Sequence, residues 1–101
     1  MAKGYWLARL TVKDQAAYGQ YRAGNEKVFA KFGGRFLVRG GNAQEGIGPK
    51  RQHNVIIEFD SYDKALACFR SAEYQEVSQF LKKGCEVDLV ICEGYEGAQP
   101  A

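Results

Sequence analysis

Hydrophobic and polar residues alternate in four short stretches of the chain, separated by segments rich in glycine or in charged residues. A period of two is the pattern of a β-strand with one buried face, so strands are predicted at 5–12, 35–39, 53–59 and 87–92. The segment 40–52 is rich in glycine and is predicted to be an irregular loop. A loop of this length is often a lid or a binding loop, although an ordinary surface excursion fits equally well.

Between the strands the hydrophobic residues recur at helical spacing. Residues 15–32 form one amphipathic stripe, which Asp14 is placed to cap and Gly33 to end. A second helical region follows the third strand, with a break and a new start at Ser71. The pattern therefore predicts one long helix and one interrupted helix.

The order strand–helix–strand–strand–helix–strand predicts an α+β, ferredoxin-like fold. Right-handed crossovers place the first and third strands at the centre of a four-stranded antiparallel sheet, with the helices on one face. We expect a single domain over residues 1–96 and a polar tail over 97–101. The second face of the sheet is then left bare.

The residues expected on this open face are apolar and charged in a mixture. Alternation assigns to it Leu7, Leu37, Ile56 and Val90 together with Arg9, Arg39, Glu58 and Asp88. A contiguous exposed apolar patch usually marks an interface, whereas charges of this number do not suit a plain core. We therefore expect a homodimer through the open sheet face, with a partly polar cleft between the two copies.

Composition and charge narrow the classes of partner. The 101 residues carry 14 Lys+Arg and 12 Asp+Glu, a surplus of +2 that is too small to favour nucleic-acid binding. The open-face residues of the third strand, Asn54 to Glu58, also lack the aromatic and basic side chains of RNA-recognition modules. No stretch is long and apolar enough to cross a membrane, and Lys3 and Arg9 interrupt any signal-peptide apolar region. We expect no nucleic acid, no membrane and a cytoplasmic location.

The cysteines and the single histidine do not suggest a metal centre. Cys68, Cys85 and Cys92 are far apart in the sequence, as free and mostly buried thiols are. A zinc site would require all three to converge on His53, whereas structural zinc ligands usually come in closely spaced pairs. We expect neither a metal nor a cofactor.

Several motifs of the chain resemble those of one bacterial family. They are Tyr18-x-x-Tyr21-Arg22, Gly33-Gly34-Arg35-Phe36-Leu37-Val38-Arg39-Gly40-Gly41, Glu58-Phe59 and Ser71-Ala72-Glu73-Tyr74. Together they resemble the domain of unknown function 1330 family from Gly4 to Gly94, and the long glycine–arginine run is the most specific of them. The family departs from this chain at Phe69 and Arg70, where many members carry Trp and Tyr, and this difference alters the expected pocket lining.

The resemblance implies a fold and an assembly without a settled reaction. The family belongs to the dimeric α+β barrel group. That group also includes antibiotic-biosynthesis-type monooxygenases, muconolactone-isomerase-like and chlorite-dismutase-like proteins, and ligand-sensing domains of transcription factors.

Arg39 and Glu58 are the leading candidate catalytic residues, because both are expected on the open face of adjacent strands. In the catalytic interpretation, Arg39 would bind a carboxylate or enolate while Glu58 moves a proton. The alternative is that the two residues form a structural ion pair beside the interface. His53, at the start of the third strand, is a further acid–base candidate because histidine normally titrates near neutral pH. A plain surface histidine is the alternative reading.

Ligand-binding candidates complete the set. By resemblance, Tyr18, Arg22 and Tyr74 would line the open end of the cleft, although periodicity by itself assigns the two tyrosines to helix–sheet packing. Arg9, which alternation assigns to the open face, is the fourth ligand-binding candidate.

Three functions fit these observations. The first is binding of a small polar or carboxylate-bearing molecule at the homodimer interface. The second is a cofactor-independent, isomerase- or monooxygenase-like enzyme that uses Arg39 and Glu58 on a small organic acid or aromatic compound. The third is a structural or interaction module without catalysis.

Overall fold

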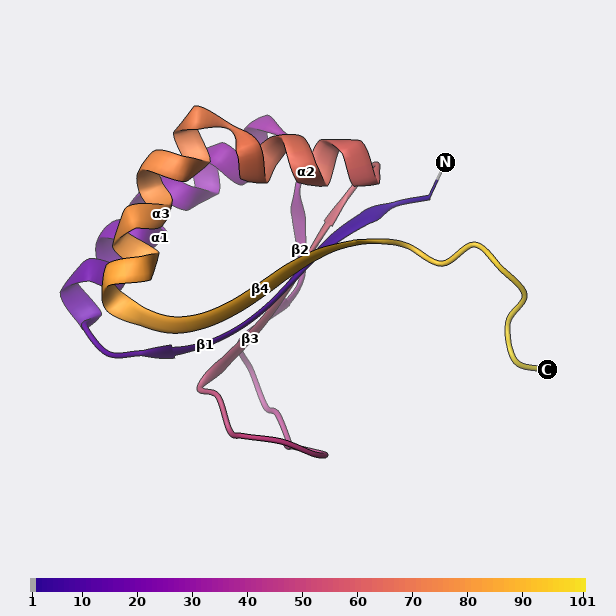
Figure 1. The fold of residues 1–101 in the computed structure, drawn as a ribbon, viewed down its shortest axis with the longest axis horizontal. Helices are drawn as coiled ribbons and strands as arrows, with labels where there is room; N and C mark the ends of the chain where they lie inside the picture. Colours follow the sequence, from indigo (N-terminus) through magenta and orange to yellow (C-terminus); the bar gives the residue numbers. More distant parts are fainter. Residues whose placement is uncertain (1) are drawn as a thin grey trace.

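The structure, a computed structural model that describes residues 2–101, consists of one sheet with three helices packed on one side of it (Figure 1). The elements are β1 (Gly4–Val12), α1 (Gln15–Lys31), β2 (Arg35–Arg39), β3 (His53–Phe59), α2 (Tyr62–Arg70), α3 (Ala72–Gly84) and β4 (Cys85–Glu93). The predicted ferredoxin-like order is confirmed. The last strand starts at Cys85 rather than Val87.

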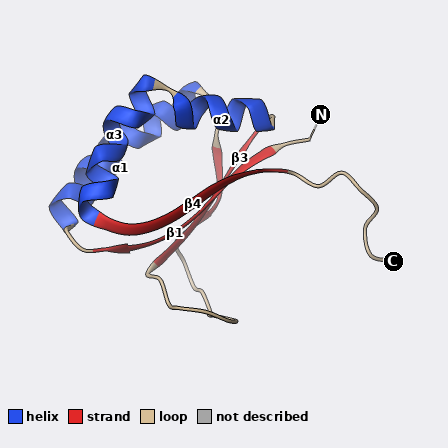
Figure 2. Ribbon diagram, in the orientation of Figure 1, coloured by secondary structure: helices blue, strands red, loops and turns tan. Residues whose placement is uncertain are grey.

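The four strands are antiparallel in the order β2-β3-β1-β4, which confirms the predicted central pair. All helices of the described chain cover the same face, and no helix covers the other (Figure 2). In the part of the chain that the structure describes, no helix is both long and apolar enough to span a membrane.

The helix boundaries follow from local chemistry. The Asp14 carboxylate accepts hydrogen bonds from the backbone N–H groups of Ala16 and Ala17, at 3.0 and 3.2 Å, and so caps α1. Gly33 follows the helix with a φ of +75°, a conformation that favours glycine. The Ser71 hydroxyl accepts a hydrogen bond from the Tyr74 N–H at 3.1 Å, which starts α3 after the predicted break.

The core between helices and sheet is centred on Trp6, which is only 2% exposed. Its ring meets those of Phe29 and Tyr74 edge to face, with centroids 5.2 and 4.8 Å apart. Its indole N–H donates a hydrogen bond of 2.9 Å to the carbonyl of Ala65. These ring contacts and the indole hydrogen bond together position α1, α2 and α3 on β1.

A β-bulge interrupts the alternation of β2. Phe36 pairs with Ile57 of β3, but Val38 pairs with Ile56, so Leu37 has no partner across the strand. An extra residue of this kind reverses the faces of all residues that follow it in the strand.

The bulge moves Arg39 to the helix-covered face, where it pairs with Val55 in the ladder and lines the same cavity as α1 residues. The prediction that Arg39 shares the open face with Glu58 is therefore wrong. It assumed uninterrupted alternation, and an inserted residue breaks that assumption.

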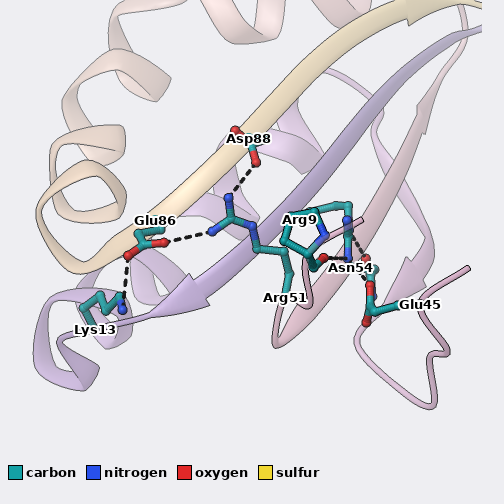
Figure 3. A network of polar contacts seen from close by, with 8 residues as sticks. Arg9, Lys13, Glu45, Arg51, Asn54, Glu86 and Asp88 are labelled. Atoms are coloured by element: carbon teal, nitrogen blue, oxygen red, sulfur yellow. Dashed lines mark hydrogen bonds and ion pairs between the residues drawn. The ribbon is translucent and has the colours of Figure 1, made fainter. Parts of the chain in front are cut away.

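The long loop between β2 and β3 extends on the side of the sheet opposite the helices (Figure 1). Two sets of ion pairs fasten it to the open face (Figure 3). Arg51 contacts Asp88 at 3.1 Å and a neighbouring glutamate of β4, and Arg9 of β1 contacts Glu45. These contacts tie the loop to the sheet at Glu45 and Arg51, whereas its tip at Ile47 is fully exposed.

Candidate functional site

A cavity of about 650 Å³ lies between α1, α3 and the helix-covered face of the sheet. The buried part of its wall includes the aromatic rings of Trp6, Phe29 and Tyr74. Exposed residues of α1 and of the loop after β2 mark its open end. A volume of this size with apolar walls and a few polar groups is typical of a small-molecule site.

Tyr18, His53 and two arginines form the open end of the cavity. The Tyr18 and His53 rings stack with centroids 6.1 Å apart and an angle of 14° between their planes. Burial raises the pKa of the Tyr18 phenol, and the positive charges of Arg22 and Arg39 partly offset that shift. The phenol therefore stays protonated at neutral pH. It lies close enough to both guanidinium groups for their charges to affect its pKa.

The two arginines at this end differ in their partners. Arg39 donates to the carboxylate of Glu26 on α1 at 2.5 Å, and its guanidinium lies 4.1 Å from the centroid of the Phe36 ring. Arg22 has no acidic group within ion-pair distance among residues 2–101. The open end consequently carries one uncompensated positive charge.

A polar cluster interrupts the apolar wall of the cavity. The hydroxyl groups of Tyr21 and Tyr74 are 2.9 Å apart and share a hydrogen bond. Burial raises the pKa of both phenols, so both remain protonated. Asn25, which is 5% exposed, also lines the cavity, and its Oδ1 is the one buried side-chain oxygen or nitrogen of residues 2–101 without a hydrogen-bond partner.

The cavity brings together most of the residues that the sequence singled out. Those lining it are Arg39, His53, Tyr18, Arg22 and Tyr74. Glu58 and Arg9 belong instead to the open face, where they pair with Tyr5 and Asn54 in the ladder. The roles assigned to these residues stay predictions, but Glu58 and Arg9 are separated from the others by the sheet.

The arginine partner of Glu58 is Arg35, with which it forms an ion pair, and the Tyr5 hydroxyl donates a hydrogen bond to it at 2.8 Å. That hydrogen bond and the nearby Arg35 lower the pKa of the carboxyl group. Because Glu58 and Arg39 lie on opposite faces, they cannot act together on one small ligand.

Sequence reasoning missed Asn25 and did not place Tyr21 in the site. A signal for them was present, because Asn25 follows Tyr21 by four residues and precedes Phe29 by four in the buried stripe of α1. A polar residue at a position that should be apolar is the kind of exception that marks a site.

The lining of the cavity combines apolar side chains with a few polar and cationic groups. Within residues 2–101, no group of three or more His, Cys, Asp or Glu side chains could hold a metal ion. Cys68 is buried in the core, and burial raises the pKa of its thiol to about 12, so it is not a nucleophile at neutral pH. The aromatic walls and the guanidinium groups are the features able to hold an organic molecule.

Solved structures of three proteins share this fold. A protein of unknown function from Rhodopseudomonas palustris is 18% identical, with a TM-score of 0.77 over 95% of this chain and 85% of its own. SnoaB, a cofactor-independent oxygenase from Streptomyces nogalater, is 15% identical, with a TM-score of 0.64 over 99% and 97% of the two chains. A dimeric protein of unknown function with a ferredoxin-like fold from Bacteroides fragilis is also 15% identical, with a TM-score of 0.60 over 90% and 95%.

Similarity at these levels establishes the fold. No curated protein is significantly similar to the chain in sequence. The sequence model of one family matches residues 3–95, which is nearly the whole domain. The chain therefore belongs to the family described as Domain of unknown function (DUF1330).

Proposed function

We propose that the protein binds a small planar organic acid in the cavity between α1 and the sheet. The observation that carries this proposal is the bulge at Leu37. Because of it, Arg39 lies on the helix-covered face and lines the same aromatic cavity as Arg22. Two guanidinium groups at the open end of an apolar cavity suit a ligand with a flat apolar body and one acidic group.

The physical roles follow from the surroundings of each group. Aromatic and aliphatic side chains of the wall would contact the body of the ligand, and burial of that apolar surface supplies most of the affinity. Arg22 carries the charge that no protein acid neutralises, and guanidinium binds carboxylate through charge-assisted, often bidentate hydrogen bonds. Arg39, shared with Glu26, would fix the orientation of the acid.

Calorimetric titration with naphthoate tests the proposal. We expect binding to the wild-type protein and at least roughly tenfold weaker binding to Arg22→Ala, because a hydrogen bond to a charged group is worth about 1.5–3 kcal/mol. Arg70→Ala is the matched control, since Arg70 is an exposed arginine of α2 outside the cavity. Equal losses in the two variants, or no heat with the wild-type protein, would contradict the proposal.

A second candidate function is a cofactor-independent enzyme that acts in the same cavity. His53 favours it, because its imidazole lines the open end where an acidic ligand would lie and is stacked on Tyr18. The shared fold with the oxygenase SnoaB is consistent with this function. Incubation of a bound acid in air and under argon, with product detection by mass spectrometry, distinguishes catalysis from binding. Loss of product in His53→Asn with unchanged affinity would support it.

We also propose that two copies associate through the open sheet face. Leu7 and Val90 on this face are 39% and 56% exposed, and a hollow of about 420 Å³ between them and Ile56 offers room for partner side chains. The Bacteroides fragilis protein is itself described as dimeric. A partly polar cleft between the copies, with Arg9 and Glu58 in it, stays the prediction for this face.

Sedimentation equilibrium tests the association. Val90→Asp would bury a carboxylate in the interface, so we expect dimerisation to weaken at least roughly tenfold. Ile47→Asp is the control, because Ile47 is fully exposed on the loop. A wild-type monomer at micromolar concentration would refute the association.

A further inference from the structure

Helix α1 contains two glycines, and packing within the fold explains only one of them. A Cβ atom on Gly24 would lie 2.6 Å from Cγ2 of Val77, so the close approach of α1 and α3 requires the absence of a side chain there. A Cβ atom on Gly19 would meet nothing within 4 Å among residues 2–101, apart from its chain neighbours and the backbone of α1 itself. Packing therefore leaves Gly19 unexplained.

The backbone of α1 does not require glycine at this position either. The φ of Gly19 lies outside the left-handed region, so alanine could adopt the same conformation. Glycine is unfavourable in the middle of a helix, because its backbone loses more conformational freedom on folding than that of any other residue. Alanine at position 19 would therefore stabilise the protein without a clash. The demand for glycine has to come from something other than the fold.

Gly19 is exposed and lies at the open end of the cavity. Gln15, Gly19 and Arg22 all line the cavity, and they follow one another along α1 at intervals of four and three residues. Residues at these intervals are neighbours on one side of a helix. Gly19 is thus a position without a side chain between Gln15 and Arg22.

The proposed acid site determines which part of a ligand would lie beside Gly19. With the acid group at Arg22 and Arg39, the atoms attached next to that group would lie close to Gly19, because Gly19 and Arg22 are neighbours on the helix. A side chain at position 19 would compete with those atoms for space, whereas glycine leaves the space free. On the loop side, Gly40 and Gly41 also line this end of the cavity without side chains.

We propose that Gly19 is a specificity-determining residue, and that the space left by its missing side chain receives a ring or substituent next to the acid group of the ligand. The ligand class is then planar acids that are substituted beside the acid group, such as acids on a fused ring system. This inference rests on the proposed function, because the acid site at Arg22 and Arg39 sets the orientation of the ligand.

The two isomers of naphthoate test the inference, because they share one acid group and one ring system. In 1-naphthoate the second ring lies beside the acid group, whereas in 2-naphthoate it points away from it. We expect 1-naphthoate to bind Gly19→Leu at least roughly tenfold more weakly than the wild type, because the leucine side chain would occupy the space of the second ring. Binding of 2-naphthoate should stay within about threefold of the wild type. Each affinity is measured by calorimetry at the same pH and salt concentration.

Ala23→Leu is the matched control, because Ala23 is exposed, lies one turn further along α1 and does not line the cavity. Both isomers should bind this variant as they bind the wild type. Gly19→Ala is the second variant, which keeps the test open if Gly19→Leu does not fold. Its melting temperature without ligand should rise by about 2–8 °C, while its affinity for 1-naphthoate relative to 2-naphthoate should fall by about threefold. A merely structural glycine would change the melting temperature and leave that ratio unchanged.

The outcomes separate this inference from the proposed function. If the wild type binds only 2-naphthoate, or if Gly19→Leu weakens neither isomer or both equally, the role of Gly19 is wrong and the acid site stands. The two neutral naphthamides, which have the same shapes and a carbonyl acceptor without the charge, are measured in parallel. If they show the ratio that depends on Gly19 while neither naphthoate binds, the role of Gly19 stands and the acid site is wrong. If none of these probes binds, both are refuted.

Discussion

The two faces of this sheet are made of the same strands but are organised in different ways. The helix-covered face packs Trp6, Ile57 and their neighbours into an aromatic core that leaves a cavity of about 650 Å³. The open face alternates apolar side chains with acids and bases that pair with one another and with the loop (Figure 3). One face leaves space for a ligand, and the other satisfies its charges internally.

The two arginines at the ends of β2 show how this difference arises. Arg35 lies before the bulge and is paired with Glu58 of the open face. Arg39 lies after it and points to the cavity, paired with Glu26 of the helix layer. One unpaired residue, Leu37, thus decides which face receives a guanidinium group. The following predictions test this comparison, from the largest expected effect to the smallest.

Truncation of adjacent residues on the two faces should have unequal effects on stability. Trp6→Ala is expected to lower the free energy of unfolding by about 3–5 kcal/mol, because it opens a hole in the core. Leu7→Ala should cost about 1 kcal/mol or less, since Leu7 is 39% exposed. Urea unfolding at low protein concentration measures both. Similar losses would mean that the open face is as well packed as the core.

Replacing each of the two β2 arginines in turn should weaken ligand binding in one case only, that of the arginine on the cavity side. Arg39→Ala is expected to weaken naphthoate binding by about 10- to 100-fold, in line with the loss of a charge-assisted hydrogen bond. Arg35→Ala should leave the affinity unchanged. Glu26→Gln should strengthen binding, because Arg39 would lose its internal acid. A stronger effect of Arg35 than of Arg39 would place the ligand on the open face instead.

Glu58 on the open face and Tyr74 in the core should lose their contributions to stability at opposite ends of the pH scale. The Tyr5 hydrogen bond and Arg35 hold the pKa of Glu58 below its ordinary value of 4.5, so this contribution is complete above that pH and is lost as the pH falls through the lowered value. Burial holds the pKa of Tyr74 above its ordinary value of 10.0, so its contribution is complete below pH 10.0 and is lost as the pH rises further.

Urea midpoints measured across pH test these two directions. Glu58→Gln should flatten the acid limb and should also reduce the alkaline limb in part, because the hydrogen bond to Glu58 is what chiefly raises the pKa of Tyr5. Tyr74→Phe should flatten the alkaline limb and leave the acid limb unchanged. A flat acid limb in the wild-type protein would show that the ion pair on the open face contributes nothing to stability.

Deletion of Leu37 should have the smallest effect. The residue has no partner in the ladder, so its removal leaves Val38 opposite Ile56 and Arg39 on the cavity side. We expect naphthoate affinity to stay within about threefold of the wild type. If the strand alternated without a bulge, the same deletion would turn Arg39 to the other face, and binding would fall as it does in Arg39→Ala.

Most of the fold could be predicted from the sequence because its signals are local. Asp14 caps a helix through groups two and three residues away, and Gly33 ends it through its own backbone freedom. The alternation in β1 and β3 assigns each side chain to the correct face. Such features need no knowledge of distant residues.

The candidate site could be predicted only in part. The resemblance implies that Tyr18, Arg22 and Tyr74 line the open end of an interface cleft, and in the structure they line the cavity of the helix-covered face. The pairing of Arg39 with Glu58 failed, since a bulge is defined by the partner strand and not by the residues of β2 alone. Asn25 was overlooked because only the tertiary structure shows that its amide oxygen is buried without a partner.

The sequence by itself determined the order of the elements, their caps, the family and the two-faced sheet. The tertiary structure decided where a ligand has room and which charges face it. The physical reason is how far apart in the sequence the interacting residues are. Caps and alternation depend on near neighbours along the chain. Register and cavity volume depend instead on how strands pair and how large side chains from several elements fill the space between them.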